Sequence, residues 1–89
     1  MSELAVILEE RKKQHGDFSV HAAITQGLKA VAQSDIGNYS SMAPTQREAV
    51  DMILHKIGRI LAGDPNHHDH WDDIAGYAKI TRDRIKVTS

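Results

Sequence analysis

The longest segment with a helical period, Thr45–Ala62, constrains the fold of this chain most. Apolar residues recur in it at intervals of three and four positions, which is the spacing of one face of an α-helix. Gly63 and Pro65 end the segment, because glycine suits a helix cap and proline cannot continue the helix. A long helix with a wide apolar band needs cover on several sides, so we predict that it lies at the centre of the domain. The band consists of Ala49, Val50, Met52, Ile53, Ile57, Ile60 and Leu61.

Three further segments carry the same period, and none shows the alternation that is typical of a strand. We predict helices at about Ser2–Gln14 and Phe18–Gln33, and a last helix that starts near Asp69. Between the second and third helices, Ser34–Pro44 is rich in Ser, Gly and Asn and reads as a loop. The sequence therefore predicts one all-α domain over residues 1–89, a small bundle of about four helices.

The helix ends carry recognisable caps. Ser2 is a candidate N-cap of the first helix, and Asp17 or Ser19 is a candidate N-cap of the second, because each has a side-chain oxygen that can accept a backbone hydrogen bond. Thr45 and Glu48 have the spacing of a capping box, and Asp69 is expected to cap the last helix.

Glycines and apolar stripes give expectations about packing. Gly16 suits a left-handed position after the first helix, whereas Gly27, Gly58 and Gly76 lie inside helices and are expected to permit close approach of a neighbour. The buried stripe of the last helix is predicted to be Trp71, Ile74, Ala75, Ala78 and Ile85.

Size and composition limit the classes of protein. A chain of 89 residues with no cysteine and four aromatic residues buries a modest core, so self-association is expected. The lack of cysteine fits a cytoplasmic protein. The only N-terminal apolar run, Leu4–Leu8, is too short for a membrane span or a signal peptide. A net charge of −1 argues against nucleic-acid binding, which usually needs a basic excess.

Acidic residues gather on the last two helices. Glu48, Asp51 and His55 fall on one face of the third helix, and Asp69 and Asp73 lie in the first turns of the fourth. If the two helices pack side by side, these carboxylates converge and need a divalent cation, for which Mg²⁺ or Mn²⁺ is the natural choice. The alternative is that the acids are only helix caps and first-turn charges that suit the helix dipole.

Several neighbours of these acids are candidates for a phosphate-bearing substrate. His55, Lys56 and Arg59 follow on the third helix and are expected to meet phosphate oxygens, while Trp71 is a candidate aromatic plate for a nucleotide base. The histidines at positions 67, 68 and 70 lack the spacing of a zinc site and are predicted to be exposed.

Two segments, Gln46–Pro65 and Asp69–Ile80, combine a Lys-x-x-Arg pair, a Gly-Asp turn and an Asp-x-x-x-Asp-Ile-Ala-Gly-Tyr-Ala element. Together with ERKKQHGDF at Glu10–Phe18, they resemble a family of small helical proteins of phages and prophages. The likeness spans most of the chain, and no settled activity comes with it.

That family is similar in turn to all-α nucleoside triphosphate pyrophosphohydrolases of the MazG type. Such enzymes hold Mg²⁺ with two pairs of acids on successive helices and cleave between the α and β phosphates. The resemblance implies that Glu48 and Asp51 form the first pair and that Asp69 and Asp73 form the second. One motif copy per chain implies a homo-oligomer, either a dimer or a tetramer.

Three functions follow from these observations. The first is a Mg²⁺-dependent nucleotide pyrophosphohydrolase or a nucleotide-binding relative. The second is a non-catalytic oligomeric accessory protein of phage type that acts by protein–protein interaction. The third, DNA binding by a helix-turn-helix, fits least, because the connection 63–68 is too long and the helix after it opens with acids that repel phosphate.

Overall fold

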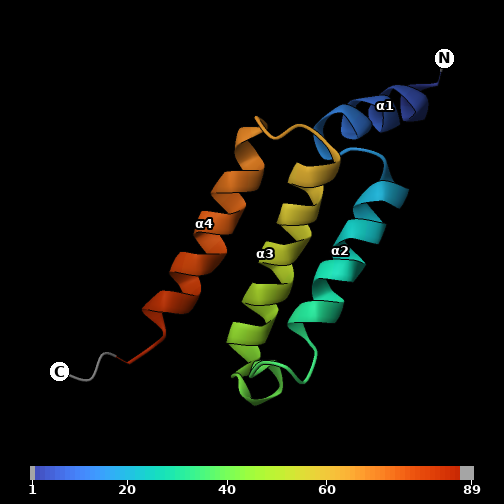
Figure 1. The fold of residues 1–89 in the computed structure, drawn as a ribbon. Coiled ribbons are helices and arrows are strands. Elements are labelled where there is room, and N and C mark those ends of the chain that lie inside the picture. Colours follow the sequence, from blue (N-terminus) through green and yellow to red (C-terminus); the bar gives the residue numbers. More distant parts are fainter. Residues whose placement is uncertain (1, 87–89) are drawn as a thin grey trace.

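The structure, a computed structural model, describes residues 2–86 and consists of four α-helices and one short 3₁₀-helix (Figure 1). The part of the chain that it describes contains no strand, so the all-α prediction is confirmed. The elements in order are α1 (Glu3–His15), α2 (Phe18–Ala32), η1 (Tyr39–Ser41), α3 (Pro44–Ala62) and α4 (His68–Asp83).

Local signals set the beginnings of α1 and α2 as predicted. The Ser2 hydroxyl accepts a hydrogen bond from the Ala5 amide at 3.2 Å, and an Asp17 carboxylate oxygen accepts from the Ser19 amide at 2.9 Å. Between the two helices Gly16 has a φ of 82°, in the left-handed region that favours glycine. The turn between α1 and α2 is therefore fixed by its own residues.

α3 and α4 begin within one residue of the predicted positions, but their predicted caps were wrong. α3 starts at Pro44, whose ring is preset for the first helical position, and the Gln46 side chain accepts from the Ala43 amide at 3.0 Å. Thr45 and Glu48 therefore lie inside the helix and form no capping box. α4 starts one residue before Asp69, which makes no cap hydrogen bond.

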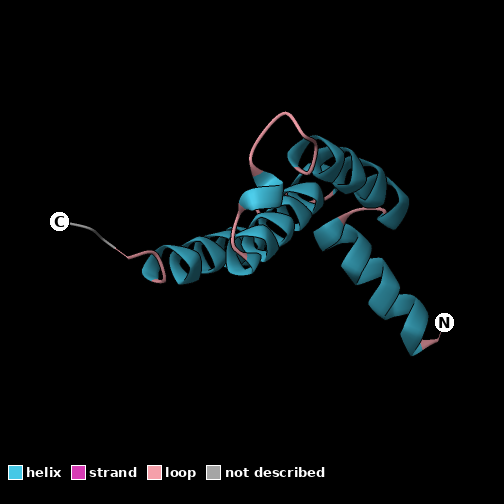
Figure 2. Ribbon diagram, turned by 90° about the horizontal axis from the view of Figure 1, so that it is seen from below, coloured by secondary structure: helices cyan, strands magenta, loops and turns pink. Residues whose placement is uncertain are grey.

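Three of the helices form a single layer. α3 lies between α2 and α4 and packs against both, whereas α2 and α4 do not pack against each other (Figure 1). α1 joins the layer only at its C-terminal end and points away from it (Figure 2). The molecule is accordingly elongated, with extents of 58 × 27 × 20 Å.

Gly58 allows α2 to approach α3 closely. It is buried, and a Cβ atom at this position would lie 2.0 Å from Thr25 Oγ1 and 3.1 Å from the His21 ring. The prediction of close packing at Gly58 is thus confirmed. At Gly27 and Gly76 a Cβ atom would meet nothing within 4 Å, so the same prediction is wrong for them within the chain.

The core of a single chain is small. Among the apolar residues of 2–86, only Ala49 is fully buried, and the other buried side chains are polar: His21, Thr25 and His70. The predicted buried stripe of α4 was largely wrong, since Trp71 and Ile85 are 53% and 54% exposed. α4 instead turns His70, Ile74, Tyr77 and Thr81 inward, and no second layer covers the neighbouring stripe.

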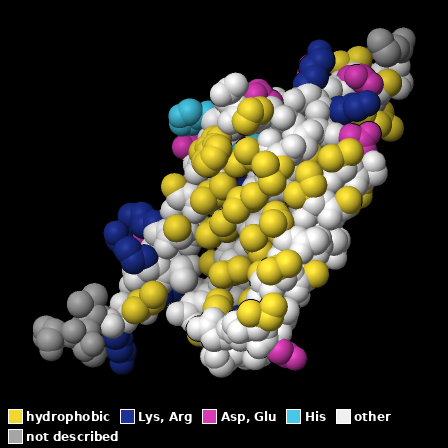
Figure 3. Space-filling view, in the orientation of Figure 1, with side chains coloured by type: hydrophobic (Ala, Val, Ile, Leu, Met, Phe, Trp, Pro, Cys, Tyr) yellow, Lys and Arg dark blue, Asp and Glu magenta, His cyan; other side chains and the backbone are white. Residues whose placement is uncertain are grey.

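One side of the layer carries a continuous apolar surface, which we call the apolar face (Figure 3). On each helix its residues are spaced alternately about four and three positions apart, so they share one side of the helix. This side differs from the one that packs against the neighbouring helix. The members are Val20, Ile24, Gly27 and Val31 of α2, Val50, Leu54, Ile57 and Leu61 of α3, and Trp71, Ala75 and Ala78 of α4, with Ile85 just beyond α4.

None of the helices within residues 2–86 combines the length and the apolar character that crossing a membrane requires.

The packing at Gly58 gives a first testable prediction. We expect Gly58→Ala to lower the free energy of unfolding by about 1–3 kcal/mol, because the added methyl group collides with Thr25 and His21. Gly76→Ala is the matched control: its methyl group meets open space, and the gain in helix propensity should raise stability by up to about 1 kcal/mol. Urea unfolding at one protein concentration measures both, and equal effects would contradict the packing described.

Candidate functional site

Two glycines bring the turn after α1 onto the end of α3. A Cβ atom at Gly16 would lie 2.1 Å from the Ala62 carbonyl oxygen, and one at Gly63 would lie 2.5 Å from the Gly16 nitrogen. The Asp64 amide donates a hydrogen bond to the Gln14 carbonyl at 3.3 Å. Backbone thus meets backbone directly here, and the last turn of α1 is held beside the last turn of α3.

A buried histidine completes this junction. His70 of α4 is 1% exposed, and its Nε2 donates to the Gln14 carbonyl at 3.1 Å and lies 3.2 Å from His15 Nδ1. The His67 ring stands edge-on to the ring of His70, with centroids 4.7 Å apart. The prediction of three exposed histidines was therefore wrong for His70, and it holds for His68, whose side chain is 86% exposed.

The junction forms one wall of a pocket between α1, α2 and α3, which we call the cationic pocket. Its volume is about 490 Å³, within the usual range for small-molecule sites. Arg11 and Lys12 of α1 and Arg59 of α3 contribute three permanent positive charges. None of the three forms an ion pair with an acid of residues 2–86. The remaining lining residues are Leu8, His15, Gly16, Asp17, Phe18 and His21.

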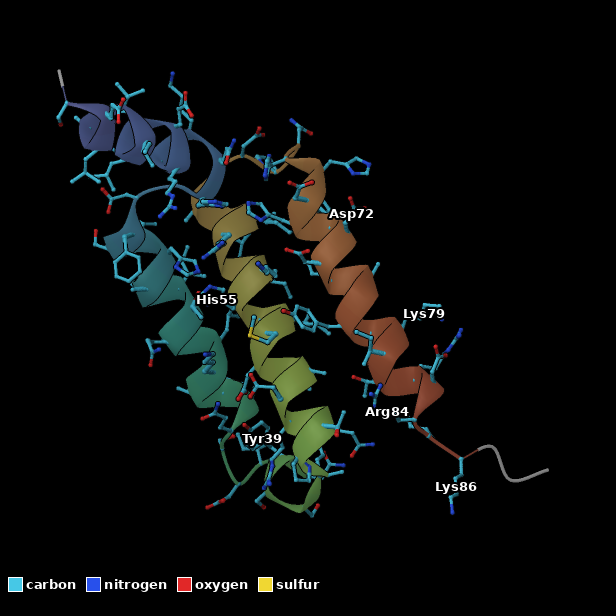
Figure 4. The ribbon with its side chains drawn as sticks, turned by 180° about the vertical axis from the view of Figure 1, so that it is seen from behind. Tyr39, His55, Asp72, Lys79, Arg84 and Lys86 are labelled. Carbon is cyan, nitrogen blue, oxygen red and sulfur yellow. The ribbon has the colours of Figure 1, made fainter. Side chains whose placement is uncertain are left out.

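Two histidines near this pocket, His15 and His55, have pKa values well below the usual one. Burial lowers the pKa of His15 to about 4, and the charge of Arg59 acts in the same direction. Burial and Arg59 likewise lower the pKa of His55 to about 4. His55 lies on α3 beside His21, with ring centroids 4.7 Å apart (Figure 4). At neutral pH His15 and His55 therefore add no positive charge to that of the arginines and the lysine.

The predicted metal ligands do not come together. The Asp51 carboxylate accepts hydrogen bonds from the Tyr39 hydroxyl at 3.0 and 3.1 Å and from the side-chain amide nitrogen of Gln33 at 3.1 Å. Asp73 pairs with Lys56, the two charged atoms being 3.0 Å apart. Tyr39 lies near the beginning of α3, whereas α4 begins at the opposite end of the layer (Figure 4).

The other two acids are equally separate. Glu48 is exposed, and a carboxylate oxygen of Asp69 lies 3.7 Å from Nε2 of His67. Across residues 2–86, no three His, Cys, Asp or Glu side chains are placed to hold a metal ion. The acids of one chain therefore do not fit a Mg²⁺ site, and the expectation that they converge within the chain was wrong.

The other predicted site residues lie in different parts of the structure. Arg59 lines the cationic pocket, and Lys56 is mostly buried beside Asp73. Trp71 belongs to the apolar face and donates from Nε1 to the Pro65 carbonyl at 2.8 Å, away from the pocket. The sequence had marked both Lys56 and Arg59 for phosphate, and only Arg59 is placed for it.

Sequence reasoning missed the contribution of α1 to the pocket. In the sequence Lys12 and Lys13 read as a solvated charged face, and Arg11 falls on the same helix face as Leu4, Ile7 and Leu8. No pattern in the sequence links Arg11 or Lys12 to Arg59. The one usable signal was the ERKKQHGDF segment, in which cations precede a glycine turn and an aromatic residue, Phe18. Tyr39 was also missed, although its hydroxyl fixes the loop after α2 to Asp51.

The fold and the pocket define a small all-α protein with a cationic site beside its N-terminal helix junction. Residues 3–85 match the family described as Domain of unknown function (DUF6378), and the chain belongs to this family. No curated protein and no solved structure matches the chain.

The pairing of Asp73 with Lys56 gives a second prediction. We expect Asp73→Ala to lower the free energy of unfolding by about 1–2 kcal/mol without any metal present, because it leaves the mostly buried ammonium group unpaired. Glu48→Ala removes an exposed acid without an ion pair and should change stability by less than about 0.5 kcal/mol. If chemical unfolding in the presence of a chelator shows no difference between the two variants, the ion pair has no structural role.

The neutral histidines give a third prediction, on pH. His15 and His55 have pKa values of about 4 in the folded chain against 6.5 in the unfolded chain, so the unfolded chain takes up protons first. Their stabilising contribution is complete above pH 6.5 and is lost as the pH falls through 6.5 towards 4. The melting temperature should therefore fall over this window.

The control for the pH dependence is a chain without the two groups. The double variant His15→Gln and His55→Gln should show a flatter decline over the same pH window, whereas His68→Gln, at an exposed position, should follow the wild type. An unchanged slope in the double variant would assign the decline to other groups.

Proposed function

We propose that this protein binds a nucleotide, with the phosphates in the cationic pocket. The observation that carries the proposal is the meeting of Arg11 and Lys12 from one helix with Arg59 from another around one open pocket. Three cations without acidic partners are costly to hold together unless an anion is bound. Guanidinium groups also match the geometry of phosphate oxygens, to which they donate two parallel hydrogen bonds.

The rest of the lining suits the same ligand. Asp17 is the only acid, and its carboxylate is already engaged as the cap of α2, where it accepts from Ser19. Phe18 follows it and is 79% exposed at the pocket. An exposed aromatic ring next to a phosphate site offers a plate on which a base stacks. In this proposal Phe18 takes the role that the sequence had assigned to Trp71.

Binding rather than hydrolysis is what the geometry supports. Asp51 is hydrogen-bonded to Tyr39 and Gln33, and Asp73 is paired with Lys56. Among residues 2–86, no three acidic or histidine side chains are placed to hold the ion. The resemblance to MazG-type enzymes supports a nucleotide as the ligand, and a cytoplasmic location, where nucleotides are abundant, is part of the proposal.

A second candidate function is a non-catalytic oligomeric protein that acts by protein–protein contact. The open apolar face favours it, since large apolar surfaces on soluble chains usually mark an interaction site. This candidate assigns no role to the cationic pocket, so substitutions in the pocket separate the two functions.

Calorimetry gives the fourth prediction. Deoxynucleoside triphosphates and pyrophosphate should bind, and deoxynucleosides without phosphate should not. Arg59→Gln should weaken triphosphate binding about ten- to a hundred-fold, because one charged hydrogen bond contributes about 1.5–3 kcal/mol. Binding should also weaken with rising salt, because the cations are solvent-accessible.

The matched control is Arg84→Gln, which removes an arginine at the other end of the layer (Figure 4) and should leave binding unchanged. Absence of binding for every phosphate ligand at millimolar concentration would refute the proposal. Pyrophosphate release from triphosphates with Mg²⁺ or Mn²⁺ would contradict the restriction to binding, and would mean that acids from separate chains share the ion.

A further inference from the structure

The described chain has one packed layer where stable domains have two. α2, α3 and α4 lie side by side, and the side of this layer that bears the apolar face has no helix on it (Figures 1 and 3). Domains are normally built from at least two layers that enclose a core between them. A single layer has no inside, which explains why Ala49 is the only fully buried apolar residue among 2–86.

The exposed area shows how much cover is missing. The accessible surface is 6606 Å² for a chain of 9.9 kDa. A compact monomer of this mass exposes about 5,200 Å². The excess of about 1,400 Å² comes from the projecting α1 and from the open face, and a standard interface buries about 800 Å² on each partner. One partner of similar size therefore suffices to cover the face.

The exposure of the large apolar side chains on this face to water is unfavourable. Val31, Leu61 and Trp71 come from three different helices and are 72%, 62% and 53% exposed. Between α3 and α4 the same side has a groove of about 440 Å³, whose lining includes Val50, Ala78 and Ile85. Covering such a face removes this apolar surface from water, which favours association.

We propose that a second copy of this chain covers the apolar face, so that two three-helix layers pack face to face. The spacing of the face supports a copy as the partner: each helix presents it at alternating intervals of four and three residues, the repeat with which helices interlock. A partner needed for stability must also be present whenever the chain is made, and a copy always is.

Gly27 lies in the middle of the stripe on α2 and separates this proposal from a structural effect. It is exposed, and a side chain there would meet nothing of its own chain within 4 Å. Gly27→Arg therefore leaves the fold of one chain intact, and arginine favours a helix more than glycine does. In a face-to-face dimer the same side chain stands in the interface and blocks the second copy.

Sedimentation equilibrium tests the proposal, with Gly76→Arg as the matched control, because Gly76 is equally open and lies on α4 outside the apolar face. The expected result is a dimer for the wild type and for Gly76→Arg, and a dissociation constant at least a hundred-fold higher for Gly27→Arg. Wild-type chains that stay monomeric at about 100 μM, or a Gly27→Arg chain that dimerises as well as the wild type, would overturn it.

The single tryptophan gives an independent readout. Trp71 belongs to the face, so its fluorescence emission should shift to longer wavelength as the wild-type protein is diluted. In Gly27→Arg the emission should already be at longer wavelength and should not depend on concentration. A concentration-independent spectrum in the wild type, at dilutions where sedimentation shows dissociation, would exclude this face as the interface.

Discussion

The backbone contact between Gly16 and Gly63 is the constraint on which the candidate site depends. A side chain at Gly16 would collide with the backbone at the end of α3, and a side chain at Gly63 would collide with the backbone at the end of α1. Only glycine therefore lets the turn after α1 lie against the end of α3. This contact, together with the buried His70, brings Arg11 and Lys12 to the same pocket as Arg59. Without it, α1 would have no fixed relation to the layer, and the positive charges would be dispersed in solvent.

α3 is central to the molecule because each of its sides contacts a different part of the structure. Gly58 packs against α2, Lys56 pairs with α4, Arg59 faces the pocket beside α1, and Leu61 belongs to the apolar face. The proposed ligand site and the proposed dimer interface therefore lie on separate surfaces of one helix. A nucleotide in the cationic pocket and a second copy on the apolar face can be present together, and neither proposal requires the other.

The misplacement of the acids has a simple geometric cause. Antiparallel neighbours place the beginning of one helix beside the end of the other, and an α-helix rises about 1.5 Å per residue. The first turns of α4 consequently lie beside Lys56, whereas Asp51 and Glu48 lie about one and a half to two turns away along α3. The acids were expected to converge although both groups lie near the beginnings of their helices. In an antiparallel pair these two beginnings lie at opposite ends.

The sequence by itself determined the all-α class, the approximate extents of all four helices, and the caps at Ser2 and Asp17, because these depend on contacts within a few residues along the chain. Only the tertiary structure decided that Arg59 meets the cations of α1, that Asp73 is paired with Lys56, and that Trp71 lies on an open face. Periodicity shows which residues share a face, but the partner of each face is set by packing between distant segments, which local spacing does not encode.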